Sequence, residues 1–119
     1  MDRNNPIAVL SKAFALRVLK LGDYLRNNKN EFLISKQIVR SGTSIGANIR
    51  ESIFAQSRLD FVSKMSIALK ESSETEYWLE LLHEAGYLED KEFDSIYNDN
   101  NKITATLINI IKKAKESEK

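Results

Sequence analysis

The chain has 119 residues, of which 42% are hydrophobic and 29% are charged, and its formal net charge is +1. This length predicts a single domain over residues 1–119. The proportions are typical of a soluble globular protein, and the near-zero charge argues against a strongly basic nucleic-acid binder. Cysteine is absent, which excludes disulfides and thiolate metal sites. No secretory signal or apolar run of about 18 residues is present, so we expect a cytoplasmic protein of bacterial type without a membrane span.

The charge is unevenly distributed along the chain. Residues 1–58 carry 10 Lys and Arg against 4 Asp and Glu, whereas residues 59–119 carry 8 against 13. Such asymmetry indicates a basic face and an acidic face on one molecule. The alternative is that the opposite charges only favour antiparallel packing of helices.

The first predicted helix spans about residues 6–26. Pro6 suits the first helical position and Asn5 is the expected N-cap. Its apolar arc is wider than one core-facing stripe, which indicates burial on more than one side. Polar residues 27–30 then interrupt the pattern, and Asn30 is the expected N-cap of the next helix.

The second predicted helix spans about residues 31–55. Gly42 and Gly46 lie inside it, and each costs about 1 kcal/mol relative to alanine. One continuous helix is favoured over a local break at 41–44, because an apolar row stays in phase across the glycines. Glycine on this face would let another backbone or a large side chain approach closely. The row consists of Ile34, Ile38, Gly42, Ile45, Ile49 and Ile53.

The third and fourth predicted helices span about residues 58–85 and 90–114. Ser57 with Asp60 is typical of a capping box, and Gly86 is a suitable left-handed C-cap with apolar residues after it. Asp90 is the expected cap of the fourth helix. Both helices carry apolar seams with alternating steps of three and four. The four segments therefore predict an all-α fold, an antiparallel up-down-up-down four-helix bundle.

Polar side chains at helical spacing indicate a network between the second and third helices. Arg40 and Lys70 are suitable partners for Glu71 and Glu74. One interpretation is a buried network that fixes register or oligomeric contacts. The other is a polar pocket for a small ligand, a phosphate or a metal. The predicted members are Gln37, Arg40, Ser44, Asn48, Glu51, Glu71 and Glu74.

Known catalytic patterns are incomplete in this chain. A di-iron bundle needs two Glu-x-x-His motifs, and only Glu80 to His83 provides one, with no second histidine in the sequence. The segment 42–46 lacks the Gly-Lys-Ser/Thr ending of a phosphate loop. The serines near it have no histidine within helical reach. We therefore expect no catalytic residue, no metal and no cofactor.

Residues 37–51 resemble the signature of bacterial four-helix-bundle proteins encoded within intervening sequences of 23S rRNA genes. The sequence QIVRSGTSIGANIRE carries this likeness, supported by KESSETEYWL at 70–79 and by Gly86-Tyr87-Leu88. Ser52 departs from the pattern, because glycine commonly follows the glutamate there. The resemblance covers about residues 7–110 and is specific between 34 and 82.

The resemblance implies bundles that assemble as ring-shaped homopentamers and have no established catalytic residues. A similar bundle is the basic accessory protein of diversity-generating retroelements, which is associated with reverse transcriptase and nucleic acid. The resemblance therefore predicts a non-enzymatic homo-oligomer that acts as a scaffold for RNA or for a nucleic-acid-binding protein. The alternative is a protein-interaction module without nucleic-acid binding. The cations expected to contact RNA are Lys12, Arg17, Lys20, Lys36, Arg40, Arg50 and Arg58.

Overall fold

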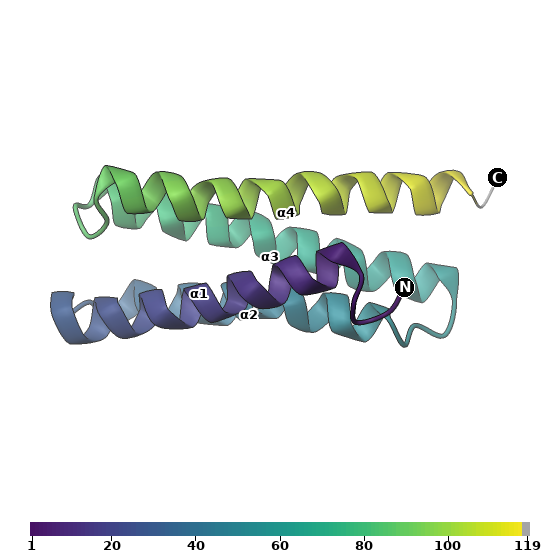
Figure 1. The fold of residues 1–119 in the computed structure, drawn as a ribbon, viewed down its shortest axis with the longest axis horizontal. Helices are drawn as coiled ribbons and strands as arrows, with labels where there is room; N and C mark the ends of the chain where they lie inside the picture. Colours follow the sequence, from purple (N-terminus) through teal and green to yellow (C-terminus); the bar gives the residue numbers. More distant parts are fainter. Residues whose placement is uncertain (118–119) are drawn as a thin grey trace.

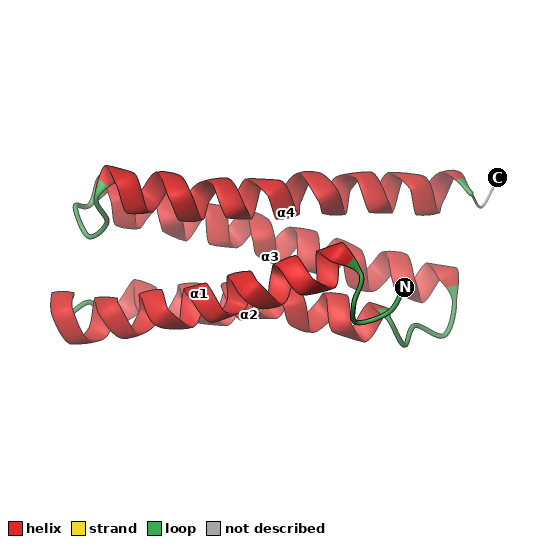
Figure 2. Cartoon of the chain, viewed as in Figure 1, coloured by secondary structure: helices red, strands yellow, loops and turns green. Residues whose placement is uncertain are grey.

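The computed structural model describes residues 1–117, which form a four-helix bundle of 49 × 22 × 20 Å. Consecutive helices run antiparallel, with α1 beside α2 and α3 beside α4 (Figures 1 and 2). The predicted all-α, up-down-up-down architecture is confirmed. Within the described residues, no helix is long and apolar enough to cross a membrane. The helices are α1 (Pro6–Lys29), α2 (Leu33–Ser52), α3 (Arg58–Glu84) and α4 (Asp90–Glu116).

Packing is uneven around the bundle. The pairs α1–α2, α2–α3 and α3–α4 pack extensively, whereas α1 and α4 contact each other much less. One contiguous core joins all four helices through fully buried residues such as Val18, Ile45, Leu79 and Ile103. The bundle is thus closed on three sides and comparatively open along the seam between α1 and α4.

Several helix ends lie where the sequence predicted them. The Asn5 side chain accepts a hydrogen bond from the Ile7 N–H, and the Ser57 side chain accepts one from the Asp60 N–H. Gly86 has a φ of +87°, a left-handed conformation that glycine adopts without steric cost. Leu88 packs back into the core after it. These local signals fix both the start of α3 and the turn that follows it.

The predicted boundary between the first two helices is wrong. Asn30 adopts a left-handed conformation (φ +52°) and ends α1, so the helix continues to Lys29 and Asn30 does not cap α2. The buried Glu31 carboxylate caps α2 instead, accepting from the N–H groups of Leu33, Ile34 and Ser35 at 3.1, 2.9 and 2.7 Å. An acidic side chain suits this position because the first N–H groups of a helix lack partners inside the helix.

Two other ends also differ from the prediction. The second helix stops at Ser52 rather than near 55, because the N–H groups of residues 53–55 bond to carbonyls three residues back. This tighter hydrogen-bond pattern is typical of a helix terminus. Asp90 is the first residue of α4 and makes no cap; Glu89 holds the N-cap position, without a side-chain hydrogen bond.

The contact between α1 and α2 depends on glycines from both helices. A Cβ added to Gly42 would lie 2.8 Å from both methyl carbons of Val18, and one added to Gly22 would lie 2.6 Å from Val39 Cγ2. The predicted close approach at Gly42 is confirmed. A Cβ added to Gly46 would lie 3.4 Å from its nearest neighbours, which are atoms of Ser11, and this is an ordinary contact distance. Gly42 and Gly46 therefore have different roles although both face α1.

This difference predicts opposite effects for the same substitution. Gly42→Ala should lower the free energy of unfolding by about 1–2 kcal/mol, because overpacking against a stiff valine outweighs the gain in helix propensity. Gly46→Ala should be neutral or stabilising by up to about 1 kcal/mol. Urea unfolding followed by circular dichroism measures both. A greater loss for Gly46→Ala than for Gly42→Ala would contradict this packing.

Candidate functional site

Arg40 of α2 forms a charged cluster with two carboxylates of α3. Its Nη1 lies 3.2 Å from Glu71 Oε2, and its Nη2 contacts Glu74 Oε2. The Trp78 indole N–H also donates to Glu74 Oε2, at 3.0 Å. Trp78 is not among the predicted network members, although its four-residue spacing from Glu74 places both on one face of α3. This cluster ties α2 to α3 on the surface of the bundle.

The cluster favours the charged forms of Arg40 and Glu74. The Trp78 hydrogen bond, together with the one from Arg40, holds the pKa of Glu74 below its usual value. The hydrogen bond to Glu74 in turn raises the pKa of Arg40. A carboxylate and a guanidinium that satisfy each other provide neither a free proton acceptor nor a free cation. The arrangement is therefore suited to holding α2 and α3 in register and unsuited to acid–base chemistry or to coordinating a metal.

The other predicted network members do not reach this cluster. Ser44 Oγ donates to the Arg40 carbonyl at 2.7 Å, and Asn48 Nδ2 donates to the Ser44 carbonyl at 2.9 Å, so both bond within α2. Glu51 pairs with Lys64 of α3 at 3.1 Å. Gln37 makes no side-chain hydrogen bond within residues 1–117. The predicted network thus consists of two separate ion-pair groups and a row of local helix contacts.

Three of the seven candidate RNA-binding cations are engaged in contacts between helices. Arg17 of α1 reaches Asp99 Oδ2 and Ser95 Oγ of α4, each at 2.8 Å. Arg40 belongs to the cluster described above. Arg58, at the start of α3, donates to the Ala114 carbonyl at 3.4 Å and contacts the Ser117 hydroxyl. These arginines hold the bundle together, which leaves them less available for phosphate.

The remaining four cations are exposed and form no ion pair or hydrogen bond within the described chain. Rows of residues seven apart show where they lie. On α1, Lys12 lies in the same row as Arg26. Arg26 lies beside Gly22 at the junction with α2, since its Nη1 would be 3.2 Å from a Cβ added to Gly22. Lys36 and Arg50 share an α2 row next to Val39 and Gly46, which contact α1. We define the α1/α2 basic face as Lys12, Lys36 and Arg50; Lys20, which is also exposed, lies on the side of α1 that borders the seam with α4.

Few acidic groups compensate this face. Asp23 pairs with Arg26 at 2.7 Å. Glu31 is buried as the cap of α2, and Glu51 is directed to Lys64 on α3. Lys36 and Arg50 are fourteen residues apart on one helix, or about 21 Å at 1.5 Å per residue. The uneven charge of the sequence is therefore visible on the surface, where the cations of the α1/α2 basic face have no carboxylate partner among the described residues.

His83 lies at the end of α3, as predicted. Its Nε2 lies 2.7 Å from Asp90 Oδ1, and its ring stacks on Phe93 at 4.0 Å between centroids. One turn earlier, Glu80 accepts a hydrogen bond from the Tyr97 hydroxyl at 2.7 Å, which raises the pKa of Tyr97 to about 12. In residues 1–117, no three His, Asp or Glu side chains converge as metal ligands would. These contacts fasten the α3–α4 hairpin.

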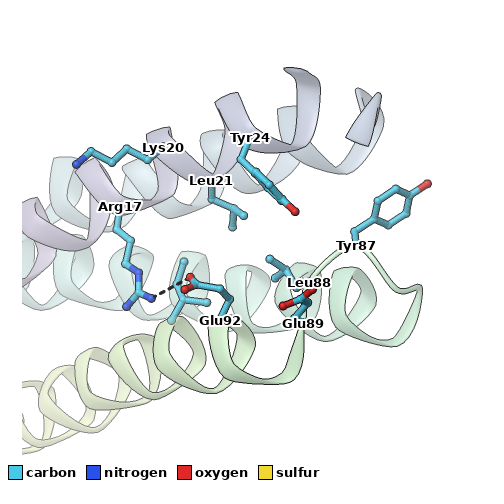
Figure 3. A pocket seen from close by; sticks show the side chains of 9 residues that line it. Arg17, Lys20, Leu21, Tyr24, Tyr87, Leu88, Glu89 and Glu92 are labelled. Carbon is cyan, nitrogen blue, oxygen red and sulfur yellow. Dashed lines mark ion pairs between the residues drawn. The ribbon is translucent and has the colours of Figure 1, made fainter. Parts of the chain in front are cut away.

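A groove of about 420 Å³ lies between α1 and the beginning of α4, at the open seam. In Figure 3, Leu21 and Tyr24 extend from α1 toward Leu88, in the turn before α4, and toward Glu92 of α4. The guanidinium of Arg17 crosses the seam and lies 3.7 Å from Glu92 Oε2. No short sequence pattern predicts this groove. The nine lining residues are Arg17, Lys20, Leu21, Tyr24, Tyr87, Leu88, Glu89, Glu92 and Ile96.

Comparison with known proteins identifies a family and a similar solved structure. The profile of the 23S rRNA-intervening sequence protein family matches residues 3–109. A crystal structure of a protein of unknown function from the S23 ribosomal protein family of Bacteroides thetaiotaomicron is similar, with 54% identity and a TM-score of 0.88. The likeness covers 89% of this chain and 98% of that one. No curated protein matches the chain.

The lowered pKa of Glu74 predicts an acid-dependent loss of stability. A carboxylate with a lower pKa in the folded than in the unfolded state stabilises the fold above its ordinary pKa of 4.5, and this contribution disappears as pH falls below that value. The free energy of unfolding should therefore drop less between pH 7 and pH 3.5 in Glu74→Gln than in the wild type. Trp78→Phe should also reduce the drop. An unchanged pH dependence in both variants would contradict the assignment.

Proposed function

Since the chain belongs to the 23S rRNA-intervening sequence protein family, we propose that it is a non-catalytic, homo-oligomeric scaffold that binds RNA through the α1/α2 basic face. The observation that carries the proposal is that the three cations of this face are exposed and have no acidic partner among the described residues. The acids of the first two helices are occupied by a capping role or by ion pairs. An uncompensated basic surface attracts the phosphate backbone of a nucleic acid.

The geometry favours contacts to phosphates over contacts to bases at this face. On α2 alone, Lys36 and Arg50 present cations about 21 Å apart along the bundle, and α1 adds Lys12 on the same face. Such cations set position and orientation on a nucleic acid but do not read its sequence. Arg17 and Arg40, which the sequence placed in the same set, are excluded from the proposed contacts because carboxylates already bind them.

Self-association is part of this proposal. Several large apolar side chains project from the bundle, among them Phe54 (73% exposed) and Leu59 (76% exposed) at one end. Val9 and Leu16 are also more than half exposed on α1. A ring of five copies, which the family resemblance implies, would cover apolar surface of this kind. It would also repeat the basic face, and repetition raises the apparent affinity for a long polyanion without any new contact.

The same apolar side chains favour a second candidate, a protein-interaction module that does not bind nucleic acid. That module would bind its partner mainly through burial of apolar surface. Salt separates the two functions, because burial of apolar surface depends little on ionic strength whereas phosphate contacts depend on it strongly.

RNA affinity should therefore fall steeply as salt increases. The double variant Lys36→Glu/Arg50→Glu should weaken binding and reduce the slope of log affinity against log salt by about 1.4–1.8, or 0.7–0.9 for each lost contact. Mobility shifts of structured RNA from about 50 mM salt upward would measure this. The matched control is Lys102→Glu/Lys112→Glu on α4, which changes the net charge equally. Equal effects of both double variants, or no retardation at low salt, would contradict the proposal.

Light scattering on purified protein tests the oligomer separately. A ring of five copies should give a mass five times the 13.6 kDa of one chain. Replacing Phe54 and Leu59 by serine should not unfold the bundle, because both side chains are mostly exposed. A monomeric mass for the wild type over the micromolar range would contradict self-association.

A further inference from the structure

We propose that the groove between α1 and α4 accepts one unpaired nucleobase of the bound RNA. This inference rests on the proposed RNA-binding function, and it assigns a separate site to the base. A nucleobase is flat, largely apolar on its two faces and rich in hydrogen-bonding groups at its edge. The groove offers a complementary surface for each of these properties.

The size and the walls of the groove suit a planar ring. Its volume of about 420 Å³ lies within the usual range for small-ligand sites, about 300–1,000 Å³. Leu88 and Ile96 are buried and form the apolar floor of the groove, and Leu21 of α1 faces them. The Tyr24 ring, which is 40% exposed, projects into the same space (Figure 3). Stacking on an aromatic ring is the usual way in which proteins hold an unpaired base.

The charges decide which part of a nucleotide enters. Glu89 and Glu92 line the α4 side of the groove. The Glu89 side chain makes no hydrogen bond or ion pair within residues 1–117, and the Glu92 side chain meets only Arg17, at 3.7 Å. Two carboxylates repel a phosphate but accept hydrogen bonds from the N–H groups of a base. The base edge should therefore point toward α4, and the phosphate should stay outside.

Lys20 is the exposed cation beside this groove. It lines the groove from α1, one turn from Tyr24. Its ammonium group has no partner among the described residues. A strand that places a phosphate at Lys20 would thus bring the attached base beside Tyr24. Arg17 remains fixed by Asp99 and Ser95 and bounds the groove on one side.

The carboxylates also predict a preference among bases. Guanine presents two adjacent donors, N1–H and the N2 amino group, which one carboxylate can accept together. Uracil presents a single N–H between two carbonyl oxygens, and these oxygens would face the carboxylates unfavourably. Guanine should therefore be preferred over uracil. The acids also offset the dipole at the start of α4, but that role does not explain an exposed tyrosine and a free lysine on the facing helix.

The test compares two single-stranded decamers, one of uridine only and one with a central guanosine, by fluorescence anisotropy at constant salt. The wild type should bind the guanosine decamer at least about fivefold more tightly. Glu89→Gln/Glu92→Gln should bring the ratio close to one, whatever the change in overall affinity. Tyr24→Ala should lower both the ratio and the affinity. Lys112→Glu serves as the control that leaves the ratio unchanged.

An equal ratio in the wild type and the double glutamine variant would overturn the groove proposal, and a continued effect of Lys36→Glu/Arg50→Glu would leave the RNA-binding proposal intact. A change of oligomeric mass in the groove variants, with no change of ratio, would show that a second copy occupies the groove and would also overturn it. If the wild type binds neither decamer nor structured RNA, both proposals fail.

Discussion

The reciprocal packing of glycine and valine between α1 and α2 is the constraint on which the rest of the structure depends. Val18 of α1 occupies the space left by Gly42 of α2, and Val39 of α2 occupies the space left by Gly22 of α1. Each helix thus supplies one gap and one stiff branched side chain. Because a shift of either helix would force a valine against backbone, the separation and the register of the pair are fixed together.

This contact has consequences on both sides of α1. The side of α1 that carries small residues packs against α2. The solvent-exposed rows beside this contact therefore lie next to each other, and their cations form the α1/α2 basic face. The other side of α1 is left to meet α4, where the packing is much less extensive. Arg17 spans that seam through its bonds to Asp99 and Ser95. The basic face and the groove therefore arise from the same helix placement.

Short polar side chains fix the register of the other helices inside the core. Asn100 of α4 is fully buried and bonds to both the hydroxyl and the carbonyl of Ser72 on α3, each at 3.0 Å. Thr75 of α3 donates to Ser41 of α2 at 2.9 Å. Buried polar groups are costly when unpaired, so a slipped register would lose these bonds and leave their atoms unsatisfied. Within the described residues, Ser35 Oγ is the single buried side-chain polar atom without a partner.

The sequence predicted what depends on local spacing. Helix periodicity, the caps at Asn5, Ser57 and Gly86, and the close approach at Gly42 all follow from residues near one another in the chain. The end of α1 was missed because Asn30 can either cap a helix start or end a helix in the left-handed region, and the Glu31 carboxylate competes for the same N–H groups. The pairing of Arg17 and the groove were missed because both depend on how far α1 and α4 diverge, which no short pattern encodes.

A double-mutant cycle between Val18→Ala and Gly42→Ala tests the central constraint most directly. Val18→Ala alone leaves a cavity, and Gly42→Ala alone introduces a clash, so each should lower the free energy of unfolding. If the two residues share one space, the decrease in the free energy of unfolding of the double variant should be smaller than the sum of the two single decreases. The difference should exceed about 0.5 kcal/mol. Losses that add to within about 0.3 kcal/mol would show that the two positions are independent and would contradict this account.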